Sequence, residues 1–178
     1  TKVLPAFRPD KVINIDKAGF VDYISKLQEV SSTHICCLPT LKKALQHRMD
    51  FFDEVGCLVS DHALDDLSFN LISDEEASSI LVKALNNEKL TKEEIAGYKT
   101  TMLIFFGKEY NKRNWKQQYH INTIRNNSSR MMSILGPDTG FDSINDCNFA
   151  QSLSKLLDTL DSTDELPKTV LYSLNPKD

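Results

Sequence analysis

The chain has 178 residues, of which 40% are hydrophobic and 26% charged, which suits one globular domain with a sizeable core. Its 25 acidic and 21 basic residues give a net charge of −4, which argues against a general nucleic-acid-binding protein, since such proteins are usually basic. No apolar run approaches the roughly 20 residues that a membrane-spanning helix needs, and the first residues lack the layout of a signal peptide. We therefore expect a cytoplasmic protein that binds neither nucleic acid nor membranes.

The cysteines give no sign of a metal ribbon or a disulfide framework. Cys36 and Cys37 are adjacent, Cys57 and Cys147 stand alone, and no CxxC pair occurs. Free and mostly buried thiols are the simplest interpretation.

The first part of the chain predicts a strand, two helices and a second strand. Residues 3–7 (VLPAF) form a short apolar run, which residues 8–11 (RPDK) should end. Asp16 is a suitable N-cap for a helix that continues to about residue 30, and a second helix is expected over about residues 40–54. Residues 57–60 (CLVS) then predict the second strand.

The second part repeats this alternation. Two capping boxes, Ser73-x-x-Glu76 and Thr91-x-x-Glu94, each open a helix, the second ending near Asn111. A third strand is expected over residues 115–121, a helix over about 148–160, and a fourth strand over 169–174.

Strands that alternate with helices pair in parallel, so an α/β fold with four short parallel strands is predicted. The carboxyl ends of the predicted strands carry unusual polar residues, which are Arg8, Asp61-His62, His120 and Asn175. Because the carboxyl ends of parallel strands share one edge, these residues should lie together, as at the site of a barrel or a doubly wound sheet.

Several polar residues have both a functional and a structural interpretation. Arg8 could hold a carboxylate or phosphate through two parallel hydrogen bonds, or it could simply pair with Asp10. His62 could ligate a metal, transfer a proton or bind a hydroxyl, or it could be a buried structural histidine. His120 should share a strand face with Gln118, a polar pair that is costly inside a barrel unless it is used.

A long polar loop follows the third strand. Its charged residues could bind substrate or could form ion pairs that hold the loop, and they are Arg125, Arg130, Asp138 and Asp142. The chain has no HxH, HExxH, GxSxG or P-loop pattern, so motif chemistry alone does not give a complete active site.

Six runs carry a resemblance to a known family: LPAFRPDK (residues 4–11), SDHAL (60–64), QYHI (118–121), RNN (125–127), LGPDTGFDSI (135–144) and LPKTVLYSLNP (166–176). Together, and in this order, they resemble uronate (glucuronate) isomerases, a divergent family of the amidohydrolase superfamily. Two positions depart from the family pattern, because Asn122 stands where a Gly is expected and Ser128 where a third Asn is expected.

The resemblance implies that residues 1–178 are a single central fragment of a (β/α)8 TIM barrel. Its four parallel strands would correspond to strands 4 to 7, with paired helices between them. The first strand with its HxH metal pair, and the last strand with its Asp base, would lie outside this chain. The fragment alone would therefore be inactive.

The resemblance also implies an activity, which is the isomerisation of hexuronates such as D-glucuronate to D-fructuronate by proton transfer between C2 and C1. It implies a homo-oligomer with a divalent metal, most naturally zinc, that polarises substrate oxygens. Arg8 would anchor the substrate through its carboxylate or an adjacent hydroxyl. The other implied site residues include His120, near the metal or a substrate oxygen. His62 would contact the substrate or a residue that binds it, with its tautomer fixed by Asp61, and Gln118 and Arg125 would lie in support.

Two other functions are compatible with the same rim of polar residues. A metal-dependent hydrolase of the same superfamily would attack an ester, amide or C–N bond with metal-bound water. A non-catalytic sugar-acid-binding or structural domain would keep the fold without turnover.

Overall fold

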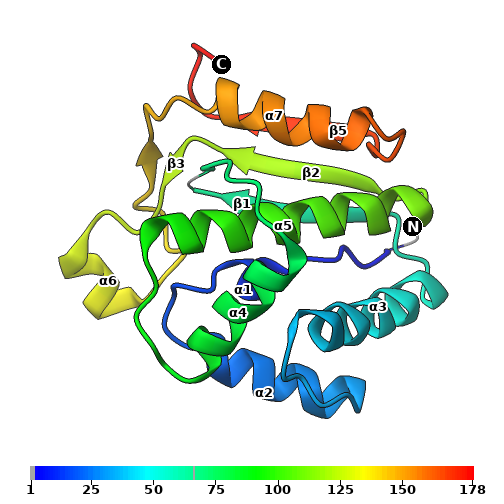
Figure 1. The fold of residues 1–178 in the computed structure, drawn as a ribbon. Helices are drawn as coiled ribbons and strands as arrows, with labels where there is room; N and C mark the ends of the chain where they lie inside the picture. Colours follow the sequence, from blue (N-terminus) through cyan, green and yellow to red (C-terminus); the bar gives the residue numbers. More distant parts are fainter. Residues whose placement is uncertain (1–2, 66) are drawn as a thin grey trace.

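The computed structural model describes residues 3–65 and 67–178 (Figure 1). The helices are α1 (Asp10–Ile13), α2 (Phe20–Ser31), α3 (Leu38–Glu54), α4 (Asp74–Leu85), α5 (Lys92–Lys112), α6 (Ser129–Leu135) and α7 (Ala150–Asp161). The strands are β1 (Val59–Leu64), β2 (Lys116–Ile121), β3 (Thr123–Ile124), β4 (Ser143–Ile144) and β5 (Thr169–Ser173).

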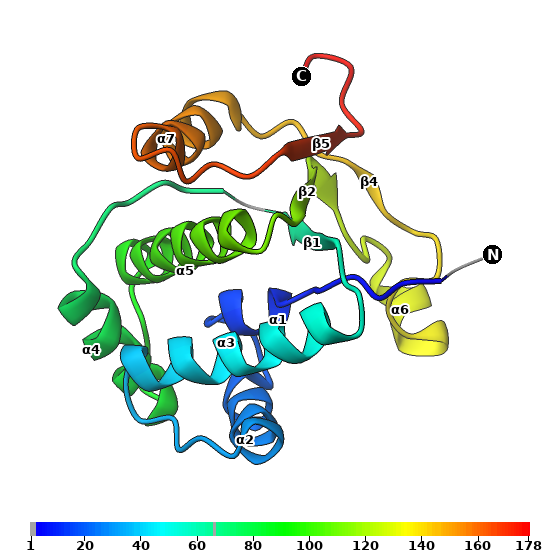
Figure 2. The same ribbon diagram turned by 90° about the vertical axis from the view of Figure 1, so that its right-hand side faces the viewer.

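The main sheet has three parallel strands in the order β1-β2-β5. Figure 2 shows α3, α5 and α7 on the same side of these strands, so one face of the sheet is covered by helices. The predicted α/β fold with parallel strands separated by helices is therefore confirmed. β5 forms an exposed edge, with most of its residues open to solvent on both faces.

The predicted strand at residues 3–7 is reduced to one bridge. Phe7 pairs in parallel with Ser60, donating to the carbonyl of Val59 at 3.0 Å and accepting from the amide of Asp61 at 2.9 Å. The next positions that face β1 are Pro5 and Pro9, and proline has no N–H to donate. The prediction of a regular strand at residues 3–7 was wrong because the positions on either side of Phe7 that face β1 are prolines, which cannot donate a hydrogen bond to the neighbouring strand.

The boundaries of the second strand also differ from the prediction. β1 runs from Val59 to Leu64, so Asp61 and His62 lie inside the strand rather than beyond it. Consecutive residues of a strand point to opposite faces of the sheet. Asp61 and His62 therefore cannot act side by side.

The helix starts that rest on side-chain caps are confirmed. Ser73 accepts a hydrogen bond from the amide of Glu76, and Thr91 forms a complete capping box with Glu94. The N-cap predicted at Asp16 was wrong, because α2 begins after Gly19, which has a φ of 84° that suits glycine. Asp16 instead pairs with Lys99 at 3.0 Å.

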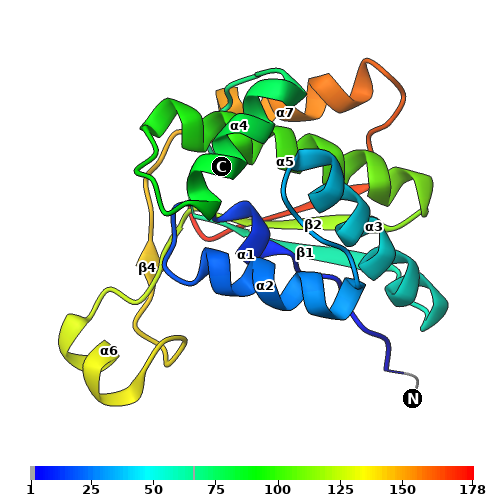
Figure 3. The same ribbon diagram turned by 60° about the horizontal axis from the view of Figure 1, so that its bottom comes forward.

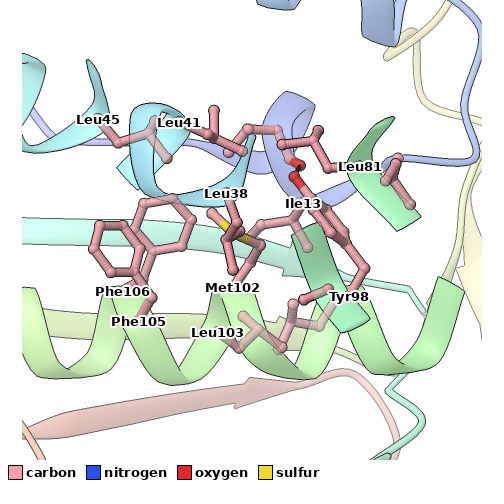
Figure 4. Close-up of a cluster of buried hydrophobic side chains, with 14 of the residues drawn as sticks. Ile13, Leu38, Leu41, Leu45, Leu81, Tyr98, Met102, Leu103, Phe105 and Phe106 are labelled. Atoms are coloured by element: carbon pink, nitrogen blue, oxygen red, sulfur yellow. Dashed lines mark hydrogen bonds between the residues drawn. The ribbon is translucent and has the colours of Figure 1, made fainter. Parts of the chain in front are cut away.

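α5 is the central helix of the core. It is apolar around much of its circumference, as expected for a helix that packs against other elements on several sides. It contacts β2, α1, α4 and α7. In Figure 4, Met102, Phe105 and Phe106 of this helix lie near Leu41 and Leu45 of α3. The sheet is thereby backed by a continuous apolar layer.

The loop between β2 and α7 contains structure that the sequence did not predict. β3 and β4 form a two-stranded antiparallel hairpin, and α6 lies between them in the chain. None of the residues of α6 is buried, and the helix projects away from the main body (Figure 3). Without a buried apolar stripe this segment carries no strong helical pattern.

The four cysteines are free thiols, as predicted, but they are not mostly buried. Only Cys57 is buried, whereas Cys36 and Cys147 are exposed. Within the described residues, no helix is both long and apolar enough to cross a membrane.

The contact between α5 and α7 predicts a sensitive glycine. A Cβ on Gly107 would lie 2.5 Å from the Cδ1 of Leu160, which is fully buried. Gly107→Ala should lower the free energy of unfolding by about 1–3 kcal/mol through overpacking, although Gly→Ala in a helix normally stabilises. Urea unfolding of the full-length protein measures this. Lys92→Ala, an exposed change on the same helix, is the control, and a more stable Gly107→Ala variant would contradict the packing.

Candidate functional site

The main sheet has two faces of different character. One face is covered by helices, and its strand residues are buried, namely Ser60, His62, Leu64, Gln117, Tyr119 and Ile121. The other face, here called the open face, carries the alternate residues. The register aligns Asp61 with Gln118 and Val170, and Ala63 with His120 and Tyr172. The prediction that Gln118 and His120 share one face is confirmed.

His62 lies on the helix-covered face with none of its side chain exposed. Its Nε2 is 3.0 Å from the hydroxyl of Tyr110, and its Nδ1 is 3.4 Å from Oδ1 of Asp10. The expectation that Asp61 fixes the His62 tautomer was wrong, because the two side chains point to opposite faces. Asp10 is the carboxylate that faces this histidine.

Asp10 joins the two faces at the edge of β1. Its Oδ2 accepts a hydrogen bond from Nε of Arg8 at 2.9 Å and another from the amide of Ala63 at 3.1 Å. Burial acts to raise the pKa of Asp10, but its contacts with His62, Arg8 and the Ala63 amide together outweigh that effect. The net result is a lowered pKa, so Asp10 is a carboxylate at neutral pH.

Arg8 and Asp61 meet on the open face. Nη1 of Arg8 lies 3.2 Å from Oδ2 of Asp61, while its Nε is bound to Asp10. The hydrogen bond that Arg8 donates to Asp10 and the charges of both carboxylates raise the pKa of Arg8. The side chain is still 52% exposed, so the guanidinium can be reached from solvent. The structural interpretation, pairing with Asp10, is therefore confirmed. Binding of a carboxylate or phosphate by the accessible guanidinium stays a prediction.

His120 is held between Asp61 and Tyr172. Its Nε2 lies 2.9 Å from Oδ1 of Asp61, and its ring stacks on Tyr172 with 4.7 Å between the centroids and 10° between the planes. Gln118 is half-buried one row below, in register with Asp61. Arg8, Asp61 and His120 thus form one connected polar cluster on the open face.

Arg125 lies beside this cluster and holds the polar loop. It pairs with Asp65 and with Asp142, each at 3.3 Å. The amide of Asn126 donates to the same Asp142 at 2.8 Å. A hollow of about 470 Å³ lies between the loop and β5, lined by His120, Thr123, Arg125, Asp142 and residues 171–174. Arg125 and Asp142 therefore form loop-holding ion pairs and also face an open space.

The backbone conformation of Asn122 explains why asparagine can stand where the family pattern has a glycine. Its φ is 58°, in the left-handed region that glycine adopts without cost and that asparagine tolerates better than most residues. Its backbone carbonyl accepts from the amide of Asn145 at 2.9 Å, which joins the end of β2 to the segment after β4. Asn122 therefore adopts the left-handed conformation that was expected of a glycine at this position.

Among residues 3–65 and 67–178, no group of three or more His, Cys, Asp or Glu side chains is arranged to hold a metal ion. His120 and Asp61 are a pair of potential ligands, and a closed metal site usually needs at least three protein ligands. The described residues therefore do not fit a complete divalent-metal site by themselves.

Three residues of the site were missed by sequence reasoning as functional candidates. Asp10 was considered only as a surface partner of Arg8, although its place at the first turn of a helix after a strand was a usable signal. Tyr172 could have been found by aligning the predicted parallel strands. Tyr110 lies on an apolar helix, and nothing in its sequence context indicates its contact with His62.

The comparisons with known proteins now identify the family. A model described as glucuronate isomerase matches residues 1–178. A uronate isomerase from Caldicellulosiruptor bescii is 51% identical over 177 residues, covering 99% of this chain and 38% of that protein. The chain belongs to the glucuronate isomerase family. The resemblance carried by the sequence runs is thereby confirmed.

Solved structures agree with this membership in the glucuronate isomerase family. The uronate isomerase from Thermotoga maritima is 35% identical and superposes with a TM-score of 0.90, covering 98% of this chain and 38% of that one. The glucuronate isomerase from Caulobacter crescentus has a TM-score of 0.84 at 23% identity over 97% of this chain and 36% of its own, which shows the fold alone. This chain thus spans well under half the length of these relatives.

The lowered pKa of Asp10 predicts how its contribution to stability depends on pH. A carboxylate whose pKa is lower in the folded than in the unfolded state stabilises the fold above about pH 4, and this contribution disappears as the pH falls through the folded pKa. The difference in unfolding free energy between wild type and Asp10→Asn should therefore be largest near pH 7 and shrink below about pH 4. Urea unfolding of the full-length protein at several pH values measures it. A difference that stays constant down to pH 2 would contradict the ionised Asp10.

Proposed function

We propose that the full-length protein is a uronate isomerase that interconverts aldo- and keto-hexuronates, such as D-glucuronate and D-fructuronate. Membership of the glucuronate isomerase family is the observation that carries this proposal. The open face supports it, since it gathers a guanidinium, a carboxylate and an imidazole where the strands of an α/β enzyme present their site.

The same proposal includes the architecture of the whole protein. The segment at Phe7 and the strands β1, β2 and β5 would be consecutive strands of a (β/α)8 barrel, corresponding to strands 4 to 7. Three observations support this: the spatial order follows the chain order, the helices lie on one face, and the edge of β5 is exposed. The remaining strands would then continue from β5 and from the segment at Phe7, and the open face would line the barrel interior.

Arg8 would bind an oxygen of the substrate. Two carboxylates, Asp10 and Asp61, already balance its charge. A third negative charge would therefore be attracted weakly, so a hydroxyl or carbonyl oxygen is favoured over the substrate carboxylate. The fixed direction of the guanidinium would orient the sugar for proton transfer between C2 and C1.

His120 would contact a neighbouring substrate oxygen. Asp61 faces its Nε2 and Tyr172 holds the ring plane, so the orientation of the imidazole is defined before substrate arrives. Gln118 and Arg125 flank this position from β2 and from the polar loop. When a divalent metal is bound in the full-length protein, it supplies polarisation of the substrate oxygens. Residues 3–65 and 67–178 do not complete its site by themselves.

The direct test is an isomerisation assay of the full-length protein with hexuronates. Arg8→Ala should raise KM by about 10- to 100-fold, the loss expected for one charge-assisted hydrogen bond. His120→Ala should lower kcat/KM by at least about 100-fold, because an orienting or proton-transferring group is lost at the reacting centre. His47→Ala, an exposed histidine on α3, is the control. A full-length protein that isomerises no hexuronate would overturn the proposal.

A further inference from the structure

A buried chain of polar groups lies behind Arg8, on the other face of the sheet. His62 is fully buried among the rings of Phe106, Tyr110 and Tyr119, with centroids 6.0, 5.7 and 5.4 Å away. A buried imidazole in such a place is costly unless both ring nitrogens have partners. The hydroxyl of Tyr110 is the hydrogen-bond partner of Nε2, whereas Nδ1 faces the carboxylate of Asp10 at 3.4 Å in a charge contact and makes no hydrogen bond.

The position of the ring proton follows from Asp10, because a carboxylate can only accept. Nδ1 faces Oδ1 of Asp10 at 3.4 Å and is therefore assigned the proton. Nε2 then accepts from the hydroxyl of Tyr110 at 3.0 Å, and burial, which raises the pKa of Tyr110 well above its usual value, keeps that hydroxyl protonated. The opposite tautomer would place a lone pair of the ring against a carboxylate.

We propose that Asp10 and His62 are positioning residues for Arg8, so that a buried histidine on one face of the sheet fixes the substrate-binding guanidinium on the other. The inference rests on the proposed role of Arg8 in binding substrate. Oδ1 of Asp10 faces His62, and this leaves Oδ2 directed at Nε of Arg8 and at the amide of Ala63.

The exposure of the groups explains why Arg8 needs this support. Its side chain is 52% exposed, and a long exposed side chain has several rotamers to choose from. Asp10 is only 17% exposed, and Oδ1 is buried. Oδ1 has no hydrogen-bond partner and faces Nδ1 of His62 at 3.4 Å, so replacement of His62 by an apolar residue removes this compensating polar contact. The carboxylate is then expected to turn toward solvent and release Arg8.

Two substitutions at His62 separate positioning from simple packing. His62→Asn places its amide nitrogen near the position of Nδ1 and keeps a donor toward Asp10. His62→Phe fills the same buried space without any donor. In the full-length protein we expect His62→Phe to raise KM for the hexuronate about tenfold with kcat within about threefold, and His62→Asn to restore KM to within about threefold of wild type. Asp10→Asn should raise KM at least as much as His62→Phe.

Combination with Arg8→Ala gives the decisive comparison. If His62 acts through Arg8, His62→Phe should change KM less than about twofold in the Arg8→Ala background, because the group that it positions is gone. Glu165→Gln, which removes a carboxylate paired with Lys108 at the amino end of β5, is the matched charge control and should leave the kinetics unchanged.

The contrary outcomes are distinct from failure of the proposed function. A tenfold effect of His62→Phe in both backgrounds, or no effect on KM in either, would overturn the positioning role while leaving the isomerase proposal intact. A wild-type KM in Arg8→Ala would overturn the binding role of Arg8 and this inference together. A crystal structure of the full-length His62→Phe variant provides a readout without activity. Arg8 turned away from Asp10 supports the inference, and an unchanged contact between Nε and Oδ2 overturns it.

Discussion

The carbonyl oxygen of Pro9 accepts from the amide of Val12 to form the turn of α1, so it does not serve the edge of β1. The carboxylate of Asp10 takes its place and accepts the hydrogen bond of the Ala63 amide, which continues the row that Phe7 begins at Asp61. One side chain thus closes the edge of the sheet, directs Arg8 onto the open face and faces His62 behind it. The arrangement of the candidate site depends on this substitution of a side-chain acceptor for a backbone acceptor.

The polar residues of the candidate site fall into two groups, according to the face of the sheet on which they lie. Arg8, Asp61 and His120 form a connected and partly exposed row that solvent or a sugar can reach. His62 and Tyr110 are fully buried, and Asp10 connects His62 to that row. A sheet covered by helices on one side and open on the other permits this division, because alternate residues of each strand enter different environments.

Much of this could be predicted from sequence where the signal was local. The capped starts of α4 and α5, the parallel strands and the common face of Gln118 and His120 follow from short-range patterns. The predictions failed where the structure of a segment depends on contacts with residues distant in the sequence. Proline on both sides of Phe7 limits its strand to one bridge, and the extension of β1 through Leu64 separates Asp61 from His62. The link from Tyr110 to His62 spans 48 residues, and no periodicity reports such a contact.

The most direct test of the account is a crystal structure of the full-length protein with a hexuronate bound. We expect the sugar to lie against the open face, with its oxygens within hydrogen-bond distance of Arg8 and His120. His62 should remain behind Asp10 without touching the sugar. A sugar bound elsewhere, with both Arg8 and His120 out of reach, would contradict the assignment of the open face as the site.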